Sequence, residues 1–369
     1  MGRLPRVGVL AVTSALPDHE LPQARAKQFA RSFFADDFAG ADSGEGADAG
    51  ELERLLKTYD NAGVENRRLG RPIEWLEQPR SFAEKNAAYC EQAVQLATQA
   101  GTAALAKAGI DRREYGAIIF ASSTGLSTPS LDARLIQTLD LPRTIARLPL
   151  WGLGCGGGGA GLARARALAL GLGKPVLVIA CELCSLTFVH GDRRKSNLIA
   201  VALFGDGAAA TVVAPEPHWR PQHPGHGPEL LSGYARILDD SEHVMGWDLE
   251  PQGLRVRFAP TIPKIVDDLA REFVNEAASA AGLAADDFRH LVVHPGGRKV
   301  LDAWDSALDL DPPRLRYARE VLRDHGNMSS PTVLFVLERF LAETPASGEA
   351  GLLLALGPGF CAEGVAFRW

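Results

Sequence analysis

The stretch that decides the fold is LPLWGLGCGGGGAG, residues 148–161, which places one cysteine inside a run of glycines. Apolar residues precede the run, and a helical pattern follows it from Leu162 to about Leu170. The stretch therefore predicts a strand that turns sharply into a helix, with Cys155 at the turn. Unpaired N–H groups and the positive end of a helix dipole beside the sulfur favour the thiolate, which is the nucleophilic form. A glycine-rich turn that only buries a small cysteine is the alternative that this stretch leaves open.

Composition and charge limit the classes of function open to the chain. The 369 residues are 46% hydrophobic and 23% charged, which is typical of a globular protein. The formal net charge of −6 provides no basic excess for nucleic acid or anionic lipid, so we expect neither as a partner. Neither a signal peptide nor an apolar run of ~18 residues that would span a membrane is visible, so we expect a cytoplasmic protein.

The cysteines and clustered histidines do not form a metal-binding pattern. The five cysteines are Cys90, Cys155, Cys181, Cys184 and Cys361. Cys181 and Cys184 form a CxxC motif, but it lies in an apolar, strand-like run and has no second pair. Three histidines share a proline-rich stretch that is more typical of a solvated connector: His218, His223 and His226. We therefore expect no metal and reduced cysteines.

Strand-like and helical patterns alternate along the chain, which predicts an α/β fold with helices on both faces of a sheet. The alanine-rich stretch 82–108 predicts one long helix, and the apolar run 175–183 predicts a buried strand. The clearest change in composition is the proline-rich stretch 215–228. We expect it to connect two domains, residues 1–214 and residues 229–369.

Two further polar clusters interrupt apolar sequence as the cysteine turn does. His294 ends an apolar strand, and Asn327 directly precedes a helix. Each is a weak signal alone, because a histidine at a strand end is often structural and an asparagine before a helix is often an N-cap. Together with Cys155 they supply a nucleophile, a base and a hydrogen-bond donor. Ligands of α/β sheets bind just outside such strand ends.

Five motifs together resemble the type III, chalcone-synthase-like polyketide synthases, which belong to the thiolase-fold condensing enzymes. The motifs are GCG at 154–156, ALFGDGAAA at 202–210, HPGG at 294–297, GNMSS at 326–330 and GPG at 357–359. They occur in the family's order at near-family spacing and span most of the chain. The resemblance implies an α/β, thiolase-like layered αβαβα fold with two similar halves, and it implies a homodimer.

The resemblance also implies a reaction. An acyl group is loaded from CoA onto Cys155, malonyl-CoA is decarboxylated, and the enolate that forms attacks the bound thioester. His294 as an imidazolium would stabilise the thiolate, and His294 and Asn327 would donate hydrogen bonds to the thioester oxygen. Loss of carbon dioxide generates the carbanion, so no catalytic carboxylate is required. No permanently bound cofactor is implied, because the CoA thioesters are substrates; an acyl carrier protein is an alternative carrier of the starter.

Other positions match the family residue by residue. Phe204 matches a gatekeeper between the CoA tunnel and the cavity, and Val256 aligns with a second gatekeeper, unless a register slip brings Phe258 there. Cavity-lining positions are matched by Thr128, Cys184 and Thr187. A hydrogen-bonded set linked to aldol cyclisation is matched by Ser123, Glu182 and Ser329. The candidates for CoA binding are Arg67, Arg68, Gly296, Gly297, Arg298 and Lys299. Core packing and solvated surface are the alternatives for these positions.

The expected product class rests on two features. The stretch from Ser123 to Arg134 resembles bacterial alkylpyrone and alkylresorcinol synthases. The four glycines at 156–159 are expected to leave volume beside Cys155 for a long, narrow acyl tunnel. We therefore expect iterative condensation onto a long-chain acyl-CoA and closure to an alkylpyrone or alkylresorcinol.

Two alternative functions stay open. A ketoacyl-ACP synthase III also uses Cys, His and Asn but performs one condensation on a carrier protein; the GNMSS and ALFGDG motifs argue against it. A non-catalytic thiolase-fold protein that only binds acyl groups is the other, and the intact set of Cys155, His294 and Asn327 argues against it.

Overall fold

The computed structural model describes residues 5–35, 49–192, 194–220, 226–343 and 345–369. Part of the expected connector, including His223, lies outside these residues. The centre of the fold is one nine-stranded mixed sheet with the strand order β11-β12-β13-β8-β1-β7-β6-β4-β5. The strands are β1 Val7–Ala15, β4 Ala117–Ala121, β5 Ala146–Leu150, β6 Val176–Leu183, β7 Asp206–Pro215, β8 Glu229–Ile237, β11 Phe288–Val293, β12 Ala350–Gly357 and β13 Cys361–Arg368.

Parallel and antiparallel pairs are both present in this sheet. β4 runs parallel to β5 and β6, and β11 runs parallel to β12, whereas the other neighbours are antiparallel. β1 and β8 share a single paired position, Gly8 opposite Glu229. The strand pairing is therefore weakest where strands of the first part of the chain meet those of the second. The division into two domains at 214 and 229 stays a prediction.

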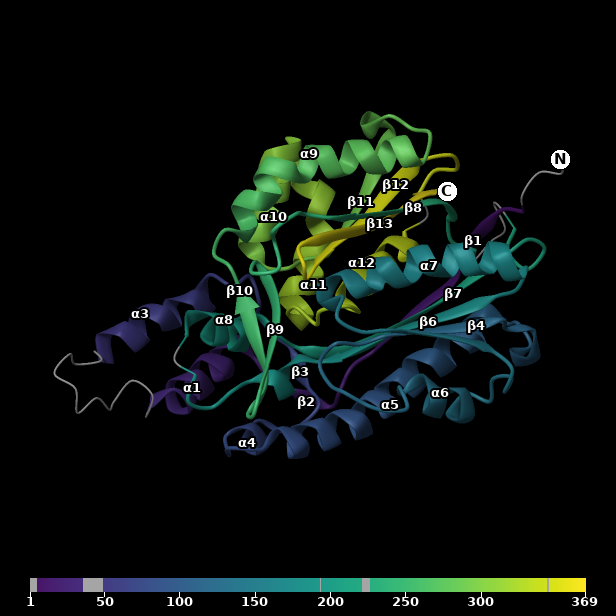
Figure 1. The fold of residues 1–369 in the computed structure, drawn as a ribbon. Helices are drawn as coiled ribbons and strands as arrows, with labels where there is room; N and C mark the ends of the chain where they lie inside the picture. Colours follow the sequence, from purple (N-terminus) through teal and green to yellow (C-terminus); the bar gives the residue numbers. More distant parts are fainter. Residues whose placement is uncertain (1–4, 36–48, 193, 221–225, 344) are drawn as a thin grey trace.

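Helices and strands form five layers (Figure 1). Helix α7, Gly157–Leu172, lies in the middle and packs on β4, β6 and β7 with one face and on β8, β12 and β13 with the other. Helix α12, Thr332–Ala342, shares this layer. The outer helices are α5 Phe82–Ala108 and α6 Asp132–Thr138 on one side, and α9 Ile262–Ala280 and α10 Arg298–Leu308 on the other. This is the layered αβαβα, thiolase-like α/β fold that the sequence predicts.

Shorter elements surround the layers. The remaining helices are α1 Gln23–Phe33, α3 Ala49–Asp60, α4 Ile73–Leu76, α8 Lys195–Leu203 and α11 Arg316–His325. Two small sheets pair β2 His19–Glu20 with β3 Arg68–Leu69, and β9 Met245–Glu250 with β10 Gly253–Phe258. No helix within the described ranges is long and apolar enough to cross a membrane. The cytoplasmic location stays a prediction.

Local sequence explains the bounds of the long helix α5. Ser81 and Glu84 form a reciprocal capping box, in which the Glu84 N–H donates to Ser81 Oγ at 3.2 Å and the Ser81 N–H donates to Glu84 Oε2 at 3.0 Å. The helix ends at Gly109, whose φ of +66° is readily adopted only by glycine. Its alanines form the buried stripe that packs on β1, β6 and β7.

The glycine run after Cys155 serves close packing of α7. A Cβ on Gly158 would lie 2.3 Å from the Ser330 carbonyl oxygen, and one on Gly159 would lie 2.7 Å from that of Glu363. Protein backbone therefore fills the space beside these two glycines. The expectation that the run leaves volume for an acyl tunnel is wrong at these positions, because the missing side chains let α7 approach both sheet halves.

Alanine at Gly158 is expected to destabilise the protein by at least about 2 kcal/mol, because the added methyl group must displace backbone in a packed layer. Gly156 is the matched control, since its nearest neighbour would lie 3.5 Å from an added Cβ and its φ of −71° suits alanine. Urea unfolding of Gly156→Ala and Gly158→Ala measures the difference. Equal stabilities of the two variants would contradict this account of the glycine run.

Candidate active site

Cys155 occupies the turn that the sequence predicts. It lies in a 3₁₀ turn, Gly154–Gly156, at the N-terminus of the sixteen-residue helix α7, and it is 6% exposed. Ser123 Oγ accepts hydrogen bonds from the N–H groups of Gly152 and Gly154, at 3.1 and 3.2 Å. The side chain of Ser123 therefore fixes the backbone on which the nucleophile sits, and the positive end of the α7 dipole adjoins the sulfur.

Asn327 faces the sulfur. Its Oδ1 lies 3.9 Å and its Nδ2 4.0 Å from Cys155 Sγ. Two backbone contacts orient the amide, since Nδ2 donates to the Gly296 carbonyl at 3.2 Å and Oδ1 accepts from the Ser329 N–H at 2.8 Å. The side-chain amide of Asn327 is thus held beside the Cys155 sulfur with little freedom to rotate away.

His294 follows β11 directly and is 4% exposed. Its backbone N–H donates to the Leu354 carbonyl of β12 at 2.9 Å. Within the described part of the chain, neither ring nitrogen has a hydrogen-bond partner. Buried polar groups are nearly always paired, so an imidazole with two unpaired nitrogens is typical of a group whose partner is a substrate. Gly296, two residues further, accepts the Asn327 amide bond and so ties the two segments together.

Burial controls the electrostatics of this site. It raises the pKa of the Cys155 thiol to about 11 and lowers the pKa of His294 to about 3. A lone thiolate or a lone imidazolium is therefore costly here. Proton transfer from the thiol to the imidazole leaves the pair net neutral, so it avoids an unpaired buried charge. Hydrogen bonds from Ser329 and Asn327 counteract part of the rise in the Cys155 pKa.

A buried carboxyl group lies behind the cysteine turn. Glu182, at the end of β6, is fully buried and accepts hydrogen bonds from the N–H groups of Ser123 and Thr124 at 2.9 and 3.0 Å, and from Thr124 Oγ1 at 2.8 Å. Ser330 Oγ donates to its other oxygen at 2.9 Å. The predicted set of Ser123, Glu182 and Ser329 is therefore corrected in one member: Ser330 donates to Glu182, whereas the side chain of Ser329 bonds the Cys155 sulfur.

The pKa of Glu182 is raised to about 7 by burial, from an ordinary value of 4.5. The folded state then binds this proton more tightly than the unfolded state, so the carboxyl group lowers stability as pH rises from about 4.5 to about 7, by at most roughly 1.4 kcal/mol for each pH unit. The neutral variant Glu182→Gln does not lose stability in this way. Its unfolding free energy minus that of the unsubstituted protein should therefore rise from about pH 4.5 to about pH 7 and stay constant above it. A difference independent of pH would show that Glu182 titrates normally.

Aromatic rings meet at the predicted gate. The ring of Phe204 lies 5.6 Å from that of Phe258, edge to face, and 6.3 Å from that of Trp247. Val256 is buried and pairs with Trp247 across the hairpin β9–β10. Val256 and Phe258 share one face of β10, so both adjoin the gate. The sequence prediction missed Trp247; its signal is one large aromatic residue in the short strand MGWDLE.

The three predicted cavity positions separate in the structure. Cys184 and Thr187 lie in a buried 3₁₀ turn, Cys184–Thr187, in which Thr187 Oγ1 donates to the Cys184 carbonyl at 2.7 Å. Thr128 lies on the surface, in the loop between β4 and α6. Its exposure in the single chain does not place it with the other two, and its role at a cavity stays a prediction.

The candidates for CoA binding differ in their exposure to solvent. Arg67 is fully buried, and its Nη1 donates to the carbonyls of Val201 and Phe204. A guanidinium in that position cannot meet a phosphate in solvent, so the prediction for Arg67 is wrong. Arg68 is partly exposed and contacts Glu20, whereas Arg298 and Lys299 are exposed at the start of α10. A Cβ on Gly63 would lie 3.2 Å from the Cβ of Arg298, so the segment before Arg67 adjoins that helix start.

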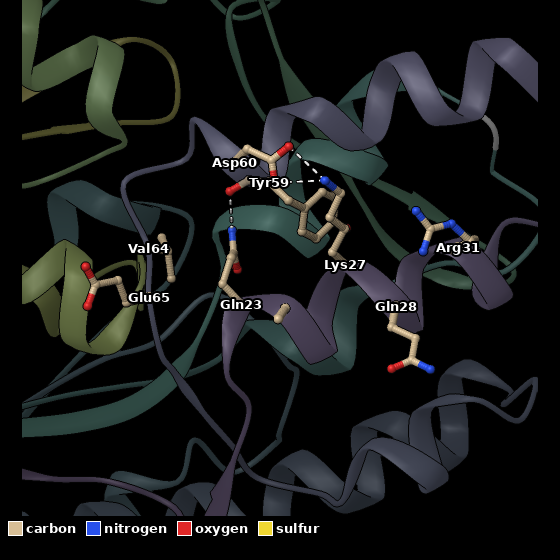
Figure 2. A pocket seen from close by; sticks show the side chains of 9 residues that line it. Gln23, Lys27, Gln28, Arg31, Tyr59, Asp60, Val64 and Glu65 are labelled. Atoms are coloured by element: carbon tan, nitrogen blue, oxygen red, sulfur yellow. Dashed lines mark hydrogen bonds and ion pairs between the residues drawn. The ribbon is translucent and has the colours of Figure 1, made fainter.

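A separate surface cavity of about 420 Å³ lies between α1 and α3 (Figure 2). Two cationic and two anionic side chains line it, those of Lys27, Arg31, Asp60 and Glu65. Lys27 pairs with Asp60 at 2.7 Å. The cavity therefore offers no excess of positive charge to a phosphate, and no predicted site residue lines it.

The layered fold, with a buried cysteine, histidine and asparagine, is that of the thiolase-fold condensing enzymes. Two family models cover nearly the whole chain: the N-terminal domain of chalcone and stilbene synthases matches residues 5–217, and the C-terminal domain matches residues 229–369. The chain belongs to the chalcone and stilbene synthase family. It is a type III polyketide synthase, an acyltransferase that performs decarboxylating Claisen condensation.

Three of the similar proteins are bacterial. A putative chalcone synthase of Bacillus subtilis is 37% identical over 98% of both chains. A 1,3,6,8-tetrahydroxynaphthalene synthase of Streptomyces peucetius is 38% identical over 98% of this chain and 93% of its own. The crystal structure of the tetrahydroxynaphthalene synthase of Streptomyces coelicolor superposes with a TM-score of 0.88 at 28% identity, covering 98% of this chain and 99% of that one.

Proposed function

We propose that this enzyme loads an acyl group from CoA onto Cys155, extends it with malonyl units and cyclises the product to an alkylpyrone or alkylresorcinol. The observation that carries the proposal is the buried Cys155 sulfur at the start of α7, 4.0 Å from the Asn327 amide nitrogen, together with the buried and unpaired ring of His294. The family membership supports the reaction class, and these contacts support the assignment of roles.

Loading uses Cys155 and His294. His294 accepts the thiol proton, and the sulfur attacks the thioester carbonyl of the starter. The new C–S bond joins the acyl group to Cys155, while the bond to the CoA sulfur breaks and free CoA takes the proton. Because burial raises the pKa of Cys155, the nearby base is essential to this step.

Decarboxylation and condensation use His294 and Asn327. The bond between the malonyl methylene and carboxylate carbons breaks, carbon dioxide leaves, and the electron pair forms an enolate whose oxygen accepts N–H bonds. The enolate carbon then attacks the acyl carbonyl on Cys155. A C–C bond forms, the C–S bond breaks, and the thiolate is regenerated for the next transfer.

An apolar surrounding supports an aliphatic starter. Phe204, Val256 and Cys184 belong to one buried hydrophobic cluster that extends to α5. The glycine run gives no support at Gly158 and Gly159, because protein backbone fills the space beside them. An aromatic polyketide built from malonyl units alone is a second candidate, favoured by the 38% identity to a tetrahydroxynaphthalene synthase.

Product analysis by mass spectrometry tests the proposal. Purified enzyme receives malonyl-CoA alone, or malonyl-CoA with acetyl-, benzoyl- or long-chain acyl-CoA. Pyrones or resorcinols from long starters, carrying more than one malonyl unit, are expected. A product from malonyl-CoA alone, with no gain from long starters, would replace the alkyl assignment by the second candidate. A single-extension product on carrier protein would indicate the ketoacyl-ACP synthase reaction instead.

We further propose that CoA approaches along the start of α10. Gly296 and Gly297 precede that helix, and Arg298 and Lys299 form its exposed first turn. The N–H groups of a helix start and two cations suit a diphosphate. Arg68 is the third cation in this proposal, although Glu20 neutralises part of its charge.

We propose that the chain forms a homodimer through the β5 edge of the sheet. β5 is an outermost strand with mostly exposed side chains, and Trp151, which follows it, is 54% exposed. The indole Nε1 donates to the Gly125 carbonyl at 3.1 Å, so the exposed ring is held in place. An unpaired edge strand beside a fixed apolar ring is typical of a surface that a second copy covers.

Trp151→Glu is expected to convert a dimer to a monomer, because the charge would be buried in that interface without a partner. Light scattering after gel filtration measures the mass. Leu249→Glu is the control, since Leu249 is 66% exposed on β9, in the hairpin on another part of the molecule. A dimer that survives Trp151→Glu would exclude this edge as the interface.

A further inference from the structure

The buried cation Arg67 lies directly behind the turn that carries the gate. The residue precedes β3, is 0% exposed, and its backbone exchanges hydrogen bonds with Leu21 at 2.8 and 3.2 Å. Its Nη1 donates to the Val201 carbonyl at 2.7 Å and to the Phe204 carbonyl at 3.3 Å. The guanidinium therefore holds the last turn of α8 and the gate residue from one side.

The same turn binds Asn327 on its other side. The Asn327 N–H donates to the Leu203 carbonyl at 2.8 Å, and its carbonyl accepts from the Gly205 N–H at 3.1 Å. The turn at 203–205 and the segment at 325–327 pack closely. A Cβ on Gly205 would lie 2.4 Å from the His325 carbonyl oxygen, and one on Gly326 would lie 2.6 Å from that of Leu203. A shift of the turn at 203–205 must therefore move the backbone of Asn327.

The energetics of Arg67 differ from those of a satisfied structural ion pair. Burial lowers its pKa to about 10, against the attraction of Tyr59 and Asp206, so it stays charged at neutral pH. The carboxylate of Asp206 is occupied by Ser185 and by the Gly70 N–H. Arg67 Nε and Nη2 have no partner in the part of the chain that the structure describes. A buried cation bound mainly through carbonyls is costly to keep for stability alone.

We infer that Arg67 is a positioning residue that fixes Asn327, and with it the decarboxylation step, through the turn at 203–205. The inference rests on the role proposed above for Asn327. Loading of Cys155 depends mainly on the sulfur, on His294 and on the cysteine turn held by Ser123, and Asn327 contributes to it only by lowering part of the raised Cys155 pKa. Loss of Arg67 should therefore affect decarboxylation more than loading.

Arg67→Met and Arg67→Lys test this, with Arg25→Met as the control for an exposed arginine that pairs only with Glu74. Methionine keeps the apolar stem, and lysine keeps a cation that can donate to both carbonyls. We expect Arg67→Met to lower kcat for malonyl-CoA decarboxylation at least tenfold, with KM and the rate of Cys155 acylation changed less than twofold. Arg67→Lys should recover at least a third of the lost kcat, and Arg25→Met should behave as the unsubstituted enzyme.

Three results would overturn the inference: an unchanged decarboxylation kcat in Arg67→Met, equal losses of acylation and decarboxylation, or no recovery in Arg67→Lys. If Arg67→Met does not fold, Gln23→Leu replaces it, because Gln23 Nε2 donates to the Ala202 carbonyl of the same helix end at 3.2 Å. An unchanged ratio of decarboxylation to acylation in Gln23→Leu would then overturn the inference. Asn327→Ala, measured beside these variants, separates the two failures. Full decarboxylation activity in Asn327→Ala would contradict the proposed role of Asn327 and this inference with it. Loss of decarboxylation in Asn327→Ala but not in the Arg67 variants would contradict only the inference about Arg67.

Discussion

Cys155→Ala is expected to reduce polyketide formation below detection, because no other group in the site can carry the growing chain. Cys184 interacts electrostatically with Cys155, but it is fully buried and its pKa is raised well above the ordinary value. The Cys361 thiol is likewise held neutral, with a pKa raised to about 11 by burial. Cys155 has a proposed base in His294, whereas neither of these thiols has one, so we expect neither to act as a nucleophile at neutral pH.

The same variant should still decarboxylate malonyl-CoA, since that step uses His294 and Asn327 and needs no covalent bond to sulfur. Product formation and acetyl-CoA release are measured on one sample by mass spectrometry. Cys90→Ala is the control for loss of a thiol, because Cys90 lies on α5 and contacts Asn86 and Leu126 rather than the site. Extended products from Cys155→Ala would contradict the assignment of the nucleophile.

His294→Ala is expected to impair both halves of the reaction. Loss of one N–H donor to the enolate oxygen should lower decarboxylation by about 10²–10³-fold. Loss of the base should leave Cys155 as a thiol, because burial raises its pKa to about 11 and no other group accepts its proton. Alkylation of Cys155 by iodoacetamide at neutral pH should therefore slow in the variant and rise with pH up to the alkaline limit of stability.

Two measurements separate these effects of His294. The rate of malonyl-CoA decarboxylation reports the donor, and the pH profile of alkylation, followed as the mass increase of the Cys155 peptide, reports the base. His290→Ala is the control, because His290 lies on the same strand and pairs with Glu349 away from the site. An alkylation profile that is identical in His294→Ala and the unsubstituted enzyme would show that His294 does not take the thiol proton.

Patterns in the sequence predict those parts of the protein that local chemistry determines. The bounds of α5 follow from a capping box, an alanine stripe and a terminal glycine, and the turn at Cys155 follows from an apolar run that meets glycines before a helix. The order of the layers follows from alternating strands and helices. The Cys155–Asn327 contact was predictable only through the resemblance, because it joins segments that the fold brings together from 172 residues apart.

Long-range packing decided the positions at which sequence reasoning failed. Arg67 and Arg68 are neighbours with the same charge, yet one points into the α8 turn and the other toward Glu20, because successive residues of an extended segment face opposite ways. Ser330 takes the place expected of Ser329, whose side chain bonds the Cys155 sulfur instead. The glycine run indicated open space, whereas the space beside Gly158 and Gly159 is occupied by the backbone of Ser330, which precedes α12, and of Glu363 in β13. No local pattern reveals this packing.

The most direct test of the account is the intact mass of the enzyme after brief mixing with a long-chain acyl-CoA, followed by mapping of the modified peptide. We expect one acyl group per chain on Cys155, its removal on addition of malonyl-CoA with release of an extended product, and no adduct in Cys155→Ala. An acyl group on another residue, or turnover to product without any adduct at Cys155, would contradict the account.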